Sequence, residues 1–134
     1  MFNSGDYSKV NEILHEDYSS GGGRVKGIEA QKQRRDYFMS AVPDGHLEIL
    51  EMIAEGDKIA IWQEVKGTFT GELGNVKGKR QLIARILVSI YEFKDGKIIS
   101  AGRREVMDNL SFFQQLGALS TTEEIVKAYN DSLK

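Results

Sequence analysis

The sequence predicts an α+β protein built on a curved, mostly antiparallel sheet that helices close. Helical patterns gather near the two ends of the chain and strand patterns gather in the middle, an order that favours α+β over alternating βαβ units. The strand patterns are long, and Asp95-Gly96 between two of them is a strong hairpin signal. A long, twisted sheet must curl, and a curled sheet covered by helices makes a pocket.

The composition is that of an ordinary globular domain. The chain has 134 residues, enough for one domain with a core of its own, with 40% hydrophobic and 28% charged residues. The formal net charge of -2 offers no basic footprint, so we expect no nucleic-acid partner. The sequence contains no cysteine, which excludes disulfides, thiolate nucleophiles and Cys-ligated zinc.

Other classes of protein also lack support. No apolar run reaches the roughly 18 residues of a membrane span, so we expect no membrane partner. The first residues, MFNSGDYSKV, lack the apolar segment of a signal peptide, and we expect a cytoplasmic protein. His15 and His46 are the two histidines, and their spacing does not indicate a zinc site.

The N-terminal part predicts two helices, Asp6–Tyr18 and Gly27–Ser40. In the first, Val10, Ile13 and Leu14 fall at the i, i+3, i+4 spacing of one helical stripe. The loop Ser19–Gly23 ends it. On the second helix we interpret Arg34 and Arg35 as a solvated face, because long charged side chains are mostly exposed.

The middle of the chain predicts four strands: His46–Ala54, Ile59–Thr70, Gln81–Phe93 and Ile98–Met107. A Gly- and Lys-rich loop, residues 71–79, joins the second and third of them. Two helices follow. Ser111–Leu116 ends at Gly117, which suits a C-cap, and Thr121–Lys134 begins with a capping box formed by Thr121 and Glu124.

Alternation along Gln81–Phe93 divides this strand into two faces, both apolar enough to need covering. Arg85, Leu87, Ser89 and Tyr91 share one face, and polar Arg85 and Ser89 beside Tyr91 suit a pocket. The opposite, wholly aliphatic face consists of Ala84, Ile86, Val88 and Ile90. An uncovered aliphatic face of this size favours aggregation, so we expect it to form a homodimer.

Six short motifs occur in the order typical of one family. They are Val42-Pro43-Asp44, Ala54-Glu55-Gly56-Asp57-Lys58, Gly67-Thr68-Phe69-Thr70-Gly71-Glu72, Asp95-Gly96-Lys97-Ile98, Asp108 and Gln114-Gln115-Leu116-Gly117. Together they make residues 5–117 resemble the SnoaL-like polyketide cyclase family, which has the nuclear-transport-factor-2-like fold. The resemblance implies a cone of curved sheet closed by helices, whose inner face lines a pocket and whose outer face commonly makes a dimer.

The resemblance also implies site residues. Asp108 falls at the position of the family's acid/base aspartate, and Arg104 falls at the position of a family tryptophan. On the predicted strand Ile59–Thr70, Gln63 and Phe69 should face inward. With Arg85 and Tyr91 these residues would contact a small apolar or mixed-polarity ligand, and the implied chemistry needs no metal or other cofactor. Arg104 beside Asp108 would hold the carboxylate ionised, which suits a base. The alternatives are a simple Arg104–Asp108 ion pair and an Asp108 that only caps the helix near Ser111. Trp62 points to the other face of the strand from Gln63 and Phe69. It suits core packing, or it could anchor a ligand or the dimer.

Two functions follow from these patterns. As a cofactor-free enzyme, the protein would use Asp108 to abstract a proton alpha to a carbonyl, with Arg104 or Arg85 stabilising the enolate, before an aldol cyclisation or an isomerisation. The alternative is a non-catalytic binding module. Two departures from the family favour the binding module. Phe69 stands where the family often has a histidine, and Ser19 follows Tyr18 where the family often has a second histidine.

The last helix does not fit the family's usual order. Thr121–Lys134 resembles the first helix of such domains, and reading it ahead of Met1–Tyr18 restores a typical N-terminal helix pair. We therefore interpret residues 1–134 as a single domain in which residues 121–134 are the first helix placed C-terminally by circular permutation. An appended helix that happens to resemble that element is the alternative. A helix swapped into a partner would also account for the order.

Overall fold

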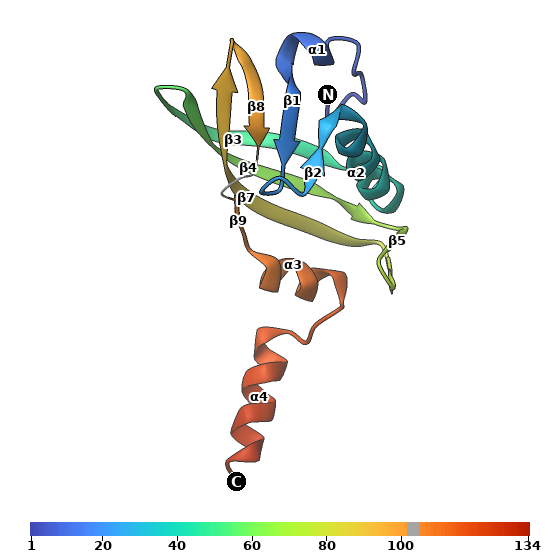
Figure 1. Ribbon diagram of the computed structural model, residues 1–134. Helices are drawn as coiled ribbons and strands as arrows, with labels where there is room; N and C mark the ends of the chain where they lie inside the picture. Colours follow the sequence, from blue (N-terminus) through green and yellow to red (C-terminus); the bar gives the residue numbers. More distant parts are fainter. Residues whose placement is uncertain (102–104) are drawn as a thin grey trace.

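The computed structural model describes residues 1–101 and 105–134 and confirms the α+β class (Figure 1). Its main sheet is curved and mostly antiparallel, and it is not closed into a barrel. The strands lie in the order β2-β1-β8-β7-β4-β3, and β9 also pairs with β7. Their bounds are β1 Leu14–Ser20, β2 Val25–Lys26, β3 His46–Glu55, β4 Lys58–Phe69, β7 Gln81–Lys94, β8 Lys97–Ala101 and β9 Glu105–Met107.

Two long central strands carry the sheet. β4 and β7 pair antiparallel along their length, from Lys58 opposite Glu92 to Phe69 opposite Gln81. β3 pairs with the other edge of β4. The loop predicted for residues 71–79 contains a small hairpin of its own, formed by β5 (Glu72–Leu73) and β6 (Val76–Lys77). The three central strands therefore match the prediction closely.

The strand predicted over Ile98–Met107 is two shorter strands, β8 and β9. β8 follows the Asp95-Gly96 turn, where both residues have positive φ (53° and 75°), as a two-residue type I′ hairpin requires. β9 pairs with a different part of β7, from Leu87 opposite Met107 to Ser89 opposite Glu105. β8 therefore pairs with the end of β7, and β9 pairs with its middle. The prediction of one continuous strand over residues 98–107 was wrong.

The helix predicted over residues 6–18 was also wrong. Only Val10–Ile13 (α1) is helical, and β1 begins at Leu14. β1 runs parallel to β8, with Ser20 opposite Ala101, and packs Leu14 and Tyr18 into the core. Tertiary pairing with a strand far along the chain has overridden a local pattern that fits a helix.

The other helices lie where the sequence predicted them. α2 (Gly27–Ala41) packs beside β1 and β2, and α3 (Asn109–Leu116) packs on β7. α3 ends at Gly117, whose φ is +81°, and α4 (Thr122–Ser132) begins with the capping box of Thr121 and Glu124. α4 projects away from the sheet, and the two chain ends lie at opposite ends of the molecule (Figure 1). Among the described residues, no helix is long and apolar enough to cross a membrane.

Two clusters of buried side chains form the core. One joins the end of α2 to α3 across β4 and β7: Ala41, Val42, Phe69, Ile83, Phe112 and Leu116. The other joins α1 and β1 to β8 and consists of Val10, Leu14, Tyr18 and Ala101, with Tyr91 and Ile98 packed against it. A cavity opens beside the second cluster, whose members Leu14, Tyr18 and Ala101 form part of its wall.

Candidate functional site

The structure confirms the predicted division of β7 into two faces. Gln63 and Ser89 are buried on the concave side, and the Gln63 amide Nε2 donates to the Ser89 hydroxyl over 3.4 Å. Arg85 and Tyr91 share this side and are half-buried. Trp62 lies on the other face, as its parity predicted, and its side chain is 46% exposed. The concave side of β7 thus carries the polar side chains of Arg85 and Ser89.

Phe69 faces inward but is wholly buried in the core cluster beneath α2 and α3. It packs against protein on all sides and lines neither of the two cavities described below. Its place in the fold is that of a packing residue.

Two cavities open side by side on the concave face, with volumes of about 100 Å³ and 150 Å³. They share four lining residues: Phe2, Tyr18, Gln31 and Ala101. The smaller, which we call the apolar cavity, is otherwise lined by Met1, Tyr7, Leu14, Tyr91 and Ile98. The larger, which we call the arginine cavity, is otherwise lined by Ser20, Arg34, Arg35, Arg85, Leu87 and Met107.

Arg85 enters the arginine cavity from the sheet. Its guanidinium Nη2 donates to the Asn109 side-chain oxygen over 3.2 Å and lies 2.8 Å from the Met107 sulfur. Its guanidinium carbon lies 4.4 Å from the centre of the Phe112 ring, within the range of a cation–π interaction. These contacts fix the cation against the wall formed by β9 and α3.

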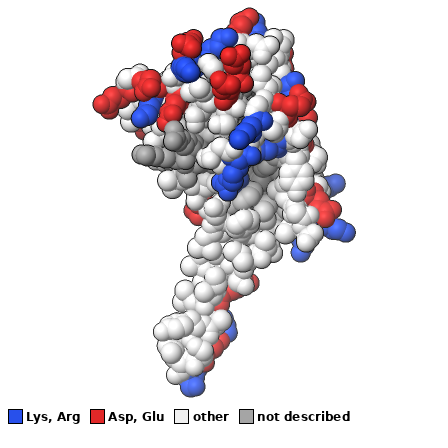
Figure 2. All heavy atoms as spheres, viewed as in Figure 1, with Lys and Arg blue, Asp and Glu red and all other residues white. Residues whose placement is uncertain are grey.

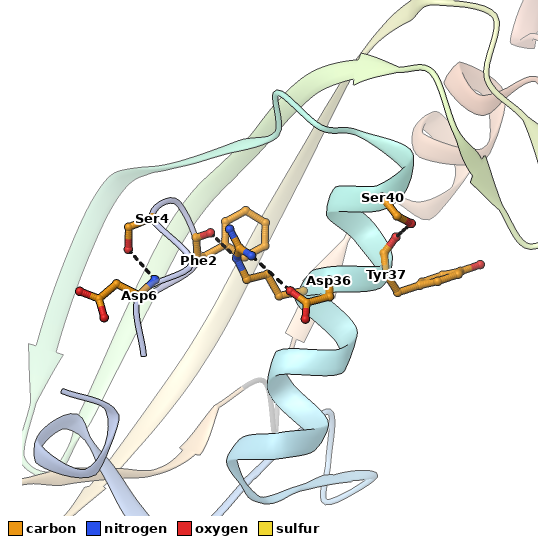
Figure 3. A network of polar contacts seen from close by, with 7 residues as sticks. Phe2, Ser4, Asp6, Asp36, Tyr37 and Ser40 are labelled. Carbon is orange, nitrogen blue, oxygen red and sulfur yellow. Dashed lines mark hydrogen bonds and ion pairs between the residues drawn. The ribbon is translucent and has the colours of Figure 1, made fainter. Parts of the chain in front are cut away.

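Arg34 and Arg35 enter the same cavity from α2, and the prediction that both are merely solvated was wrong for Arg35. The Arg35 side chain is only 14% exposed. Its Nε donates to the backbone carbonyl of Phe2 over 2.7 Å, and its Nη1 lies 3.3 Å from Asp36. Figure 3 shows Phe2 on the N-terminal segment and Asp36 on α2, each joined by a dashed line to the side chain that lies between them. Arg35 thereby ties that segment to the helix.

Arg34 is exposed at the rim, and its Nη1 lies 3.5 Å from the hydroxyl oxygen of buried Ser20. Ser20 in turn lies within hydrogen-bond distance of Gln31. Figure 2 shows blue side chains gathered on the viewed face, in the region where Figure 1 places β2 and the lower end of α2. The arginines were missed because consecutive residues point to different sides of a helix. Only the packing of α2 on β1 shows that both long side chains reach one cavity.

The apolar cavity has polar groups at its walls. Tyr7 lines this cavity, its hydroxyl can donate a hydrogen bond, and burial raises the pKa of that hydroxyl. Lys32 lies 5.2 Å from the centre of the Tyr7 ring. Tyr91 closes another part of the wall. The cavity therefore suits an apolar group with a polar edge.

Asp108 lies at the start of α3. Its Oδ1 accepts a hydrogen bond from the backbone N–H of Ser111 over 2.9 Å, and its side chain is exposed. This is the helix-capping geometry that the sequence left open as an alternative, and Asp108 lines neither of the two cavities. Arg104, the predicted neighbour of Asp108, lies outside the described residues. Within the described ranges, no group of three or more metal-binding side chains comes together.

The match to a family model decides the family. The model of the SnoaL-like polyketide cyclases matches residues 1–116. The chain belongs to the SnoaL-like polyketide cyclase family. No curated protein matches it significantly.

Several solved structures share the fold. TsrD from Streptomyces laurentii is 27% identical, with a TM-score of 0.77 over 88% of this chain and 87% of the other. AclR from Streptomyces galilaeus is 24% identical, with a TM-score of 0.77 over 98% of this chain and 87% of the other. A SnoaL-like polyketide cyclase from Agrobacterium tumefaciens is 16% identical, with a TM-score of 0.68 over 87% and 89%. The last two likenesses show the fold alone.

Proposed function

We propose that this SnoaL-like protein binds a small organic molecule of mixed polarity on its concave face. The observation that carries the proposal is the adjacency of the two cavities, which share four lining residues while differing in character. Ligand sites in proteins are concave and mostly apolar, with a few placed polar groups that orient the ligand. The apolar cavity supplies the first requirement, and the arginine cavity supplies the second.

The binding test uses a neutral aromatic probe, 2-naphthylmethanol, so that it depends on the cavities and not on charge. Amide chemical shifts from a ¹H–¹⁵N titration should change around Tyr18, Gln31 and Ala101. The Ile98→Trp variant fills the apolar cavity and should weaken binding at least about tenfold, whereas Leu82→Trp, on the opposite face, should not. Shifts confined to other surfaces, or an unchanged affinity in the Ile98 variant, would refute this placement.

A catalytic role for Asp108 is the second candidate, and one contact favours it. The next residue, Asn109, accepts the hydrogen bond from Arg85, so the Asp108 carboxylate lies close in sequence to a cation of the arginine cavity. In this scheme the carboxylate takes a proton from the carbon alpha to a ketone, the C–H electron pair moves onto the carbonyl oxygen, and Arg85 stabilises the enolate. Arg104 is a further proposed partner of that oxygen.

Deuterium exchange at the alpha carbon of 1-tetralone in D₂O tests this role without knowledge of the natural substrate. A positioned general base contributes roughly 10²–10⁴-fold. Asp108→Asn removes the base but keeps a good helix cap, so it should abolish the acceleration and leave the fold intact. Equal exchange rates with the wild type and Asp108→Asn would exclude the acid/base role, and the protein would then be a binding module.

We also propose a homodimer formed through the convex face of the sheet. Trp62, Ile86, Val88 and Val106 gather there, since β4 and β9 pair with β7 at Val88, and the exposed fraction of Val106 is 73%. A second copy of the chain is the expected occupant, because a face that is apolar along paired strands can match itself across a two-fold axis. A cytoplasmic location stays a prediction.

The place of the last helix remains a proposal as well. α4 lies at the opposite end of the molecule from residue 1, so within one chain it does not pack beside the N-terminal segment (Figure 1). Its apolar stripe is exposed, with Ile125 at 49% and Tyr129 at 63%. If residues 121–134 act as the family's first helix, they must do so on a second copy of the chain.

A further inference from the structure

We infer that the ligand of this site carries a carboxylate, or an equivalent planar oxyanion, which the arginines of the arginine cavity bind while the apolar cavity holds the rest of the molecule. This inference rests on the proposed binding function and names the chemical class of the ligand. It depends on three cations that reach one small cavity from two different walls.

The cations are placed by separate parts of the fold. Arg34 and Arg35 come from α2, and Arg85 comes from β7 on the other side of the cavity. Like charges repel, and placing three guanidinium groups around one cavity costs electrostatic free energy that an anion between them would offset.

The contacts of Arg34 point the same way. Its described contact is with a neutral acceptor, the Ser20 hydroxyl at 3.5 Å, and the described residues place no carboxylate in an ion pair with it. Within the described ranges, the carboxylate that pairs with Arg35 is that of Asp36, whose side chain is 70% exposed. A solvated carboxylate compensates a mostly buried guanidinium only in part, because water screens the interaction.

The geometry of the arginine side chain selects the ligand class. A planar guanidinium presents a fork of donors that matches both oxygens of a carboxylate, and such charge-assisted pairs are stronger than neutral hydrogen bonds. Ser20 and Gln31 add neutral polar groups beside the fork. The adjoining apolar cavity, with Tyr91 and Ile98 in its wall, accepts a ring or a short aliphatic segment. The site therefore fits a small amphipathic acid.

A matched pair of probes separates charge from shape. The full chain is titrated with 2-naphthoate and with 2-naphthamide, which have the same ring system and nearly the same outline, and binding is followed by ¹H–¹⁵N shifts. We expect 2-naphthoate to bind at least about tenfold more tightly than the amide. We expect Arg34→Gln to reduce that preference to less than about threefold without weakening the amide. Arg80→Gln, an exposed arginine outside both cavities, is the control and should leave the preference unchanged.

Arg35→Gln should also reduce the preference, but Arg35 holds the N-terminal segment through Phe2. The thermal unfolding midpoint of the Arg35→Gln variant is therefore measured in parallel. Arg35→Lys, which keeps the positive charge but loses the paired donors of the guanidinium, is compared with Arg35→Gln. A preference for naphthoate that survives in both the Arg34 and Arg35 variants would overturn the inference.

The remaining outcomes distinguish this inference from the function on which it rests. Equal affinity for the two probes, with shifts around Tyr18 and Ala101, would overturn the anionic ligand and leave the concave-face site standing. No shifts around these residues with either probe would overturn both.

Discussion

The carboxylate of Asp108 caps helix α3 by accepting the backbone N–H of Ser111 over 2.9 Å. This contact gives the residue a structural role whether or not it also moves protons. Replacing an N-cap aspartate by alanine costs about 1 kcal/mol, whereas asparagine caps equally well. We therefore predict that Asp108→Ala lowers the free energy of unfolding by about 1 kcal/mol and that Asp108→Asn changes it by a few tenths. Urea denaturation measures both, and equal losses in the two variants would contradict the capping role.

A second prediction concerns Asp44 and the pH dependence of stability. Hydrogen bonds from the Thr68 backbone N–H (2.7 Å) and hydroxyl (2.8 Å) lower the pKa of Asp44 below its ordinary value. The Thr68 hydrogen bonds to the ionised carboxylate therefore stabilise the fold. This stabilisation is fully present above the unfolded pKa of about 3.9 and is lost as the pH falls through the lower pKa of the folded state. Asp44→Asn should thus lose stability at pH 7 relative to the wild type, and the difference should shrink toward pH 2. Denaturant midpoints across this range test it, and a difference that does not change with pH would refute the assignment.

A third prediction concerns the close approach of Gly67 on β4 to Val42. A Cβ at position 67 would lie 2.2 Å from the Val42 Cγ1, so an alanine there overpacks the core. Gly67→Ala should destabilise the protein by about 1–3 kcal/mol. Val42→Ala removes the obstructing methyl groups, so the double variant should be more stable than the sum of the single effects, by at least about 0.5 kcal/mol. Strictly additive effects would mean that the two residues do not meet.

The convex face supplies the fourth prediction. Val88→Arg places a charge in the middle of the apolar face and should shift the protein from dimer to monomer in sedimentation velocity. Ile13→Arg, at a residue of nearly equal exposure on α1, is the matched control, with 39% of Ile13 exposed against 38% of Val88. A wild type that sediments as a monomer at high concentration would reject the dimer.

The fifth prediction separates α4 from the rest of the chain. An isolated helix of 11 residues is marginal in water, and α4 is held by its capping box and by the Lys127–Asp131 ion pair, not by packing on the sheet. Ending the chain after Ser120 should therefore leave the thermal midpoint of the monomer within a few degrees of the wild type. If α4 packs on a second copy, the truncation should instead weaken dimerisation. A large loss of stability at low concentration would mean that α4 supports its own chain.

The sequence predicted the central strands because each is a long run of residues that favour strands, bounded by turn residues that suit its ends. It failed at residues 6–18 for a definite reason. Leu14 and Tyr18 are four residues apart, a spacing compatible with one face of a helix and with one face of a strand. The partner that decides between them is β8, more than 80 residues later. No local pattern records that pairing.

In the candidate site too, some residues could be predicted from the sequence and others could not. Arg85 and Tyr91 were predictable because they share the parity of a recognisable strand. Arg34 and Arg35 were not, since a pair of consecutive arginines on a helix is typical of a solvated surface, and Phe2 precedes every recognisable element. These residues become part of one cavity only when the N-terminal segment folds over α2, where the Arg35–Phe2 hydrogen bond holds it.

The most direct test of the central claim is a crystal structure with 2-naphthoate. We predict electron density for the ring system between Tyr91 and Ile98, and for the carboxylate within hydrogen-bond distance of Arg34 or Arg35. Density for the probe only on the convex face or along α4, with both cavities unoccupied at saturating concentration, would contradict the account.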